Sequence, residues 1–109
     1  MTEPGDPAQS PPSGGDAVKT PVVKELVIVN KRGLHARASA KFVQLVEQFE
    51  AEVRVSRGGE TVGGTSIMGL MMLSAAPGTT IRIEASGRQA VEVADGLAAL
   101  IKDRFGEED

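Results

Sequence analysis

The sequence has no cysteine, no tryptophan and no tyrosine, and its 109 residues include one histidine and three phenylalanines. The absence of cysteine excludes disulfides and thiolate metal sites and fits a reducing compartment, so we expect a cytoplasmic protein. One histidine without cysteine cannot form the usual zinc shell, and we expect neither a metal nor another cofactor. No apolar run approaches the roughly 18 residues of a membrane span. The polar N-terminus, MTEPGDPAQS, is also unlike a secretory signal.

An excess of basic charge is missing as well. The chain has 12 Lys and Arg against 15 Asp and Glu, a formal net charge of −3. A dedicated nucleic-acid binder usually carries a strongly basic face, and a single-strand binder needs exposed aromatic rings for base stacking. An RNA-binding module is therefore a remote alternative, and we expect neither nucleic acid nor membrane as a partner.

The first 21 residues contain five of the six prolines and few large apolar side chains. Such a segment cannot bury enough surface to offset the entropy of ordering. We therefore predict a disordered tail at residues 1–21 and one folded domain at residues 22–109.

Within that domain, periodicity predicts an alternation of strands and helices. The β-branched run VVKELVIV begins it, Gly58-Gly59 marks a hairpin turn, and Gly106 stands where a helix C-cap glycine would. We expect strands at 22–29, 52–57, 60–64 and 79–85, and helices at 36–50, 66–75 and 88–105. The order β-α-β-β-α-β-α predicts an α+β fold in which helices cover one face of a mostly antiparallel sheet.

His35, the only histidine, lies in the most basic stretch of the chain, RGLHARASAKF at residues 32–42. Gly33 permits a tight turn beside the ring. The predicted helix that follows offers unpaired N–H groups and the positive end of its dipole. Residues 30–41 contain no acid and four basic residues, Lys31, Arg32, Arg37 and Lys41. Positive surroundings favour a neutral, nucleophilic imidazole, and the same groups can bind phosphoryl oxygens. A phosphoryl group carried by His35 fits this pattern better than a metal site or a catalytic triad.

The stretches GLHARASAKFV and TSIMGLMML, at their observed separation, resemble the HPr family of phosphocarrier proteins of the phosphoenolpyruvate-dependent phosphotransferase system. The resemblance covers about residues 22–107. It implies an open-faced sandwich of four antiparallel strands with three helices on one face, in a protein that we expect to be a monomer. It also implies that His35 accepts a phosphoryl group on Nδ1 from enzyme I and passes it to a histidine of a IIA protein or domain. Such a carrier is a substrate of its partner enzymes and not itself an enzyme.

The resemblance further implies that Arg37 lies beside the phosphohistidine. Ser66 matches a serine that a dedicated HPr kinase/phosphorylase modifies in some branches of the family. The motif around His35 is similar to the nitrogen-type paralogue, whereas SIMGLMML is equally similar to carriers under serine-kinase control, so the branch stays open. The family usually has proline after His-Ala-Arg, where this chain has Ala38.

Ser66 also has the sequence position of an N-cap for the apolar helix that follows. In that helix we assign Leu70 and Leu73 to the core. Helices on one face of one sheet cannot bury every side of such a helix, so we expect Ile67, Met68 and Met71 to face outward. Methionine adapts its shape to several partners. A non-catalytic regulator that binds proteins through this surface is the main alternative to a phosphocarrier.

Overall fold

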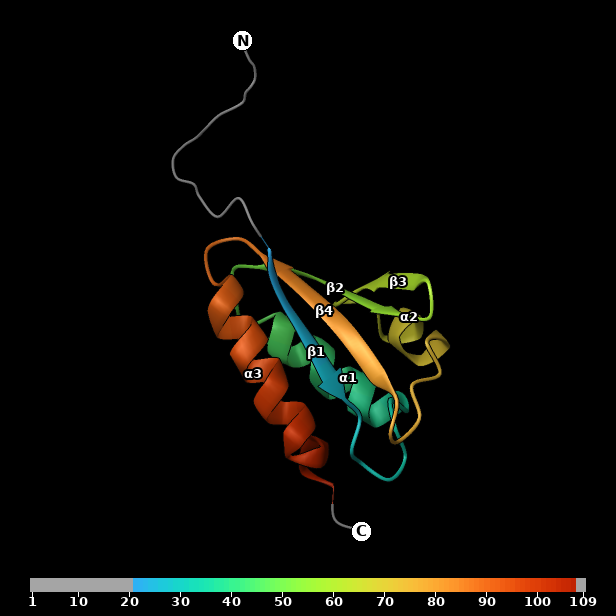
Figure 1. The fold of residues 1–109 in the computed structure, drawn as a ribbon. Coiled ribbons are helices and arrows are strands. Elements are labelled where there is room, and N and C mark those ends of the chain that lie inside the picture. Colours follow the sequence, from blue (N-terminus) through green and yellow to red (C-terminus); the bar gives the residue numbers. More distant parts are fainter. Residues whose placement is uncertain (1–20, 108–109) are drawn as a thin grey trace.

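The computed structural model describes residues 21–107, which fold into a four-stranded sheet and three α-helices (Figure 1). Residues 1–20, where we predict a disordered tail, lie outside the described residues. The predicted order of elements is confirmed. The elements are β1 (Val22–Val27), α1 (Ala36–Val46), β2 (Glu52–Arg57), β3 (Glu60–Gly63), α2 (Ile67–Met72), β4 (Thr80–Ser86), α3 (Ala90–Lys102) and the 3₁₀ turn η1 (Arg104–Gly106).

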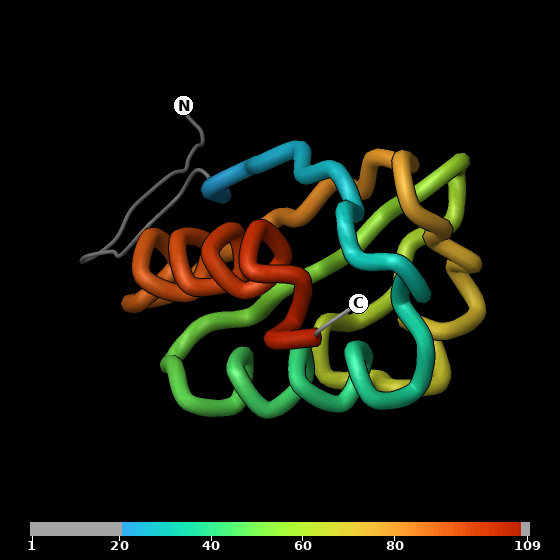
Figure 2. The backbone as a smooth tube through the Cα atoms, turned by 90° about the horizontal axis from the view of Figure 1, so that it is seen from below, coloured from blue at the N-terminus to red at the C-terminus, as the bar shows by residue number. Residues whose placement is uncertain are grey.

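The sheet is entirely antiparallel, with strand order β1-β4-β2-β3. Leu26 pairs with Ile81, and Val55 pairs with both Ile83 and Val62. The predicted hairpin joins β2 to β3, and both of its glycines have positive φ. The views from the side and from below show all three helices on one face of the sheet (Figures 1 and 2). The α+β class and the open-faced sandwich that we expected are thus confirmed.

The core fills the space between the sheet and the helices. Alternate residues of the strands are buried, as in Ile81, Ile83 and Ala85 of β4. Phe42 and Phe105 are buried completely or almost so, and Phe49 packs partly buried against the same cluster. All three aromatic side chains are therefore used in packing, which leaves none for base stacking.

Three helix ends differ from the predicted ones. Helix α1 ends at Val46 and not at residue 50, because Gln48 N–H and Phe49 N–H bond to carbonyls three residues back in tightened turns. Helix α2 ends at Met72, before Ser74 adopts a left-handed φ of +55°. The last helix ends at Lys102, and the chain then reverses through left-handed conformations at residues 104–106.

This reversal brings two distant segments together. The loop after β1 and the chain after α3 meet at one end of the molecule, which Figure 2 shows from below. Burial of Phe105 fixes the reversal, because its side chain is only 1% exposed although its backbone is left-handed. The end of the described chain therefore lies over the start of α1.

Candidate functional site

The loop between β1 and α1 is held at both ends by backbone hydrogen bonds. Ile28 N–H donates to Thr79 O at 2.9 Å, and Leu34 N–H donates to Ala75 O at 3.0 Å. Both acceptors lie between α2 and β4. The buried Asn30 closes the loop from inside, because its Nδ2 donates to Gly33 O at 2.8 Å. The backbone before His35 is thus fixed against the core.

Gly33 makes the close approach possible. It has a φ of +68°, and a Cβ added there would lie 2.4 Å from Ala75 O. The next residues place His35 as the N-cap of α1, with extended backbone angles and no hydrogen bond from its side chain to the cap N–H groups. The first-turn N–H groups of α1 therefore face a ring that does not itself satisfy them.

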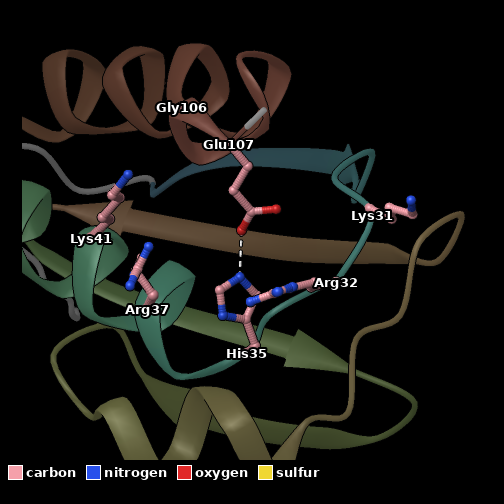
Figure 3. Close-up of a pocket in the computed structure, with 7 residues that line it drawn as sticks. All are labelled: Lys31, Arg32, His35, Arg37, Lys41, Gly106 and Glu107. Carbon is pink, nitrogen blue, oxygen red and sulfur yellow. Dashed lines mark hydrogen bonds and ion pairs between the residues drawn. The ribbon is translucent and has the colours of Figure 1, made fainter. Parts of the chain in front are cut away.

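A cavity of about 590 Å³ opens above the ring (Figure 3). It is lined by Lys31, Arg32, His35, Arg37, Lys41, Gly106 and Glu107. The four basic residues identified from the sequence thus line the same cavity as His35. Arg37 is exposed, and within residues 21–107 its guanidinium takes part in no hydrogen bond or ion pair. The cavity therefore offers cationic groups to an anion bound beside the imidazole.

The sequence around His35 contains only basic charges, but the structure places an acidic residue beside the ring as well. Glu107, 72 residues further along the chain, directs its carboxylate at His35 Nε2 (Figure 3). The other ring nitrogen, Nδ1, is turned away from this carboxylate and makes no hydrogen bond to a described residue. The two nitrogens of the ring thus have different environments.

Glu107 is held from several sides. Asn30 Nδ2 lies 3.2 Å from Oε1 and 3.3 Å from Oε2 of its carboxylate. The preceding turn is tied to α1, because Lys41 Nζ donates to Phe105 O at 2.6 Å. The hydrogen bond to His35 lowers the pKa of Glu107 below its ordinary value, with smaller contributions from Asn30 and from the charge of Arg32, although burial opposes the shift. Glu107 is therefore a carboxylate at neutral pH.

Neither Asn30 nor Glu107 was identified from the sequence. The one sequence signal near Glu107 was Gly106, which we predicted to be the glycine that ends the last helix. Its φ of +74° is indeed left-handed. No local pattern, however, links residue 107 to residue 35.

Ser66 lies outside this cavity. It is the N-cap of α2, and its Oγ accepts a hydrogen bond from Gly69 N–H at 3.0 Å, so the predicted cap is confirmed. Leu70 and Leu73 are buried as expected. The exposed apolar residues of α2 are the predicted Ile67, Met68 and Met71, together with Met72. We call these four residues the α2 apolar surface.

The described residues give no sign of a metal site or a membrane helix. No three His, Cys, Asp or Glu side chains within residues 21–107 come together as metal ligands would. Over the same residues, no helix has the length and apolar character to cross a bilayer.

The family model for the phosphorylation site of the phosphotransferase-system component HPr matches residues 22–103. The chain belongs to the HPr family. It is 50% identical over 84 residues to phosphocarrier protein HPr of Cupriavidus necator, an alignment that covers 77% of this chain and 94% of the relative. It is 35% identical over 88 residues to phosphocarrier protein NPr of Shewanella violacea, which covers 81% and 97% of the two chains.

HPr structures share the architecture as well. The crystal structure of HPr-C-His from Thermoanaerobacter tengcongensis superposes with a TM-score of 0.77 at 36% identity, covering 81% of this chain and 99% of the other. Membership of the HPr family therefore rests on both sequence and fold. The relatives named here are phosphocarrier proteins, and the matched family model describes a phosphorylation site.

Proposed function

We propose that this protein is a phosphocarrier of the phosphotransferase system and that His35 is its phosphoryl acceptor. The observation that carries the proposal is the arrangement at the start of α1. His35 has one nitrogen bonded to Glu107 and the other unengaged, beside a cavity lined by four basic residues. Because a bound anion alone would need no histidine, this arrangement supports covalent transfer over simple phosphate binding.

The transfer reaction forms one bond to phosphorus and breaks one, so it needs no cofactor. The Nδ1 lone pair of His35 attacks phosphorus, and the bond between phosphorus and its donor atom on enzyme I breaks. The electron pair of that bond returns to the donor atom. Delivery to the histidine of a IIA protein or domain is the same exchange in reverse. His35 is regenerated each time, so the protein acts as a substrate that shuttles between enzymes and is not itself an enzyme.

The groups around His35 are suited to hold the phosphoryl oxygens. A phosphoryl on Nδ1 of an N-cap residue lies where an N-cap side chain normally accepts hydrogen bonds, so the first-turn N–H groups of α1 can donate to it. Arg37 adds a charged, planar donor that matches phosphoryl geometry. Its exposure leaves it free to follow the group as it moves between partners.

The partner-binding face in this proposal is the α2 apolar surface, together with the rim of the His35 cavity. Met68 and Met72 are 70% and 75% exposed, which is costly for apolar side chains unless a partner covers them. Phosphorylation of Ser66 by an HPr kinase/phosphorylase would add negative charge at the edge of this surface. The cap position tolerates that charge, because it complements the helix dipole.

The exposed α2 apolar surface also suits a second candidate, a non-catalytic regulator of the same fold. The two functions differ in whether the protein itself becomes phosphorylated. Incubated with enzyme I and phosphoenolpyruvate, a phosphocarrier gains one phosphoryl group in its intact mass, and the group is labile to acid and stable to base. His35→Ala should abolish the gain while leaving the fold intact. An unmodified wild-type protein that still binds partners would favour the regulator, and equal labelling of His35→Ala would refute the assignment of His35.

A further inference from the structure

Glu107 is the feature of the site that neither the cationic cavity nor the start of α1 requires. An anion-binding cavity is weakened by a carboxylate within it, yet Glu107 is only 16% exposed and is bonded by both His35 and Asn30. Among the described residues it is the only acid that lines the cavity.

An ionised carboxylate has no hydrogen to donate, so it can only accept. The donor in the contact is therefore Nε2–H of His35. In a neutral imidazole, a proton on Nε2 leaves the lone pair on Nδ1. The contact thus selects one of the two tautomers and fixes the direction of the ring.

The carboxylate matters further as phosphorus bonds to the ring. When Nδ1 donates its lone pair to phosphorus and Nε2 keeps its proton, the imidazole gains a positive charge shared by both nitrogens. Glu107 stands next to that charge, so its interaction with the ring is stronger in the transition state and product than in the free protein. An interaction of this kind accelerates the step, because it is realised mainly as the reaction proceeds.

The rest of the segment holds the carboxylate in place. Phe105 anchors the reversal in the core, Lys41 bonds its carbonyl, and Asn30 donates to the carboxylate from the loop that carries His35. The carboxylate, its supporting amide and the ring therefore form one connected set. Asn30 also donates to Gly33 O, so it holds both the carboxylate and the loop that carries the ring.

We propose that Glu107 is a positioning residue for His35, which holds the ring as the Nε2–H tautomer and stabilises the charge that develops when Nδ1 takes the phosphoryl group. The second half of this proposal rests on the proposed function of His35. The first half concerns the free protein and can be measured without any partner.

The test compares wild type with Glu107→Gln, since a glutamine amide can accept from the ring or donate to it and so no longer selects a tautomer. With one histidine in the chain, ring-labelled ¹⁵N spectra give one pair of imidazole nitrogens. At a pH where the ring is neutral, we expect wild type to be almost wholly Nε2–H and Glu107→Gln to be a mixture. With enzyme I and phosphoenolpyruvate, loss of a charge-assisted contact should lower kcat about ten-fold with little change in KM.

Two further variants separate positioning from general effects. Glu107→Asp keeps the charge and should recover part of kcat. Glu50→Gln removes the same charge from a carboxylate that is 70% exposed and paired with Arg88 at 3.1 Å, away from the cavity, and should behave as wild type. Unchanged tautomer and kcat in Glu107→Gln would overturn the proposal. A wild type that selects Nε2–H but is not phosphorylated would refute the proposed function and leave the role of Glu107 on the ring supported.

Discussion

Gly33→Ala should destabilise the protein by about 2–5 kcal/mol, the sum of two costs at this position. Gly33 has a φ of +68°, and a left-handed conformation costs an L-residue about 1–2 kcal/mol. The added Cβ would lie 2.4 Å from Ala75 O, a backbone atom that cannot rotate away. Relieving such overpacking costs about 1–3 kcal/mol more. The displaced loop carries His35, so phosphorylation by enzyme I should slow as well.

Gly58→Ala is the matched control. Gly58 has a similar φ of +58°, but nothing lies within 4 Å of an added Cβ. It should therefore show only the backbone cost of about 1–2 kcal/mol and label at the wild-type rate. Urea denaturation measures both free energies of unfolding, and initial rates of labelling measure the effect on the site. Equal destabilisation of the two variants, or wild-type labelling of Gly33→Ala, would refute the reasoning that the close approach to Ala75 positions His35.

Three further predictions concern the site and its partner surface. Arg37→Ala should change the free energy of unfolding by no more than about 0.5 kcal/mol, because the side chain is exposed. It should slow phosphoryl transfer about ten-fold, and Arg37→Lys should recover only part of that rate. Normal transfer by Arg37→Ala would contradict this role. Ser66→Ala should lose about 1 kcal/mol of folding stability with its helix cap and should transfer the phosphoryl group normally. Ser66→Asp should bind enzyme I roughly 5- to 150-fold more weakly, which calorimetry can measure. Unchanged affinity of Ser66→Asp would mean that the partner surface lies elsewhere. The lowered pKa of Glu107 should stabilise the fold fully above its ordinary value of 4.5, and this contribution should be lost as the pH falls through the lowered value. Acid titration of unfolding should therefore show wild type and Glu107→Gln converging below that window, and a constant difference would contradict it.

The sequence predicted the elements of the fold because their signals are local. Alternation in residues 79–85 and the apolar face of residues 36–46 follow directly from which side of each element meets the core. The ends of the helices were predicted less well. Phe105 continues the helical spacing of α3, yet its ring reaches the core through a left-handed turn. The sequence spacing is the same whether the helix continues to Phe105 or the chain turns before it.

At the site, the sequence predicted the residues that lie close together in the chain. His35, Arg37 and the neighbouring lysines and arginines share one loop and the start of one helix, so their convergence follows from proximity. Glu107 and Asn30 were missed because their meeting depends on the packing of α3 against β1 and on the turn after α3. The exposure of Ile67, Met68 and Met71 was predicted from the layer architecture, whereas Met72 was not assigned to either side.

In the proposed mechanism, Nδ1 of His35 carries the phosphoryl group while Nε2 keeps its proton. The most direct measurement is the ¹⁵N–³¹P coupling in the protein after reaction with enzyme I and phosphoenolpyruvate, which one histidine in the chain makes unambiguous. We expect phosphorus to couple directly to Nδ1 of His35 and Nε2 to remain protonated. Coupling to Nε2, or a phosphoryl group on any other residue, would contradict the claim.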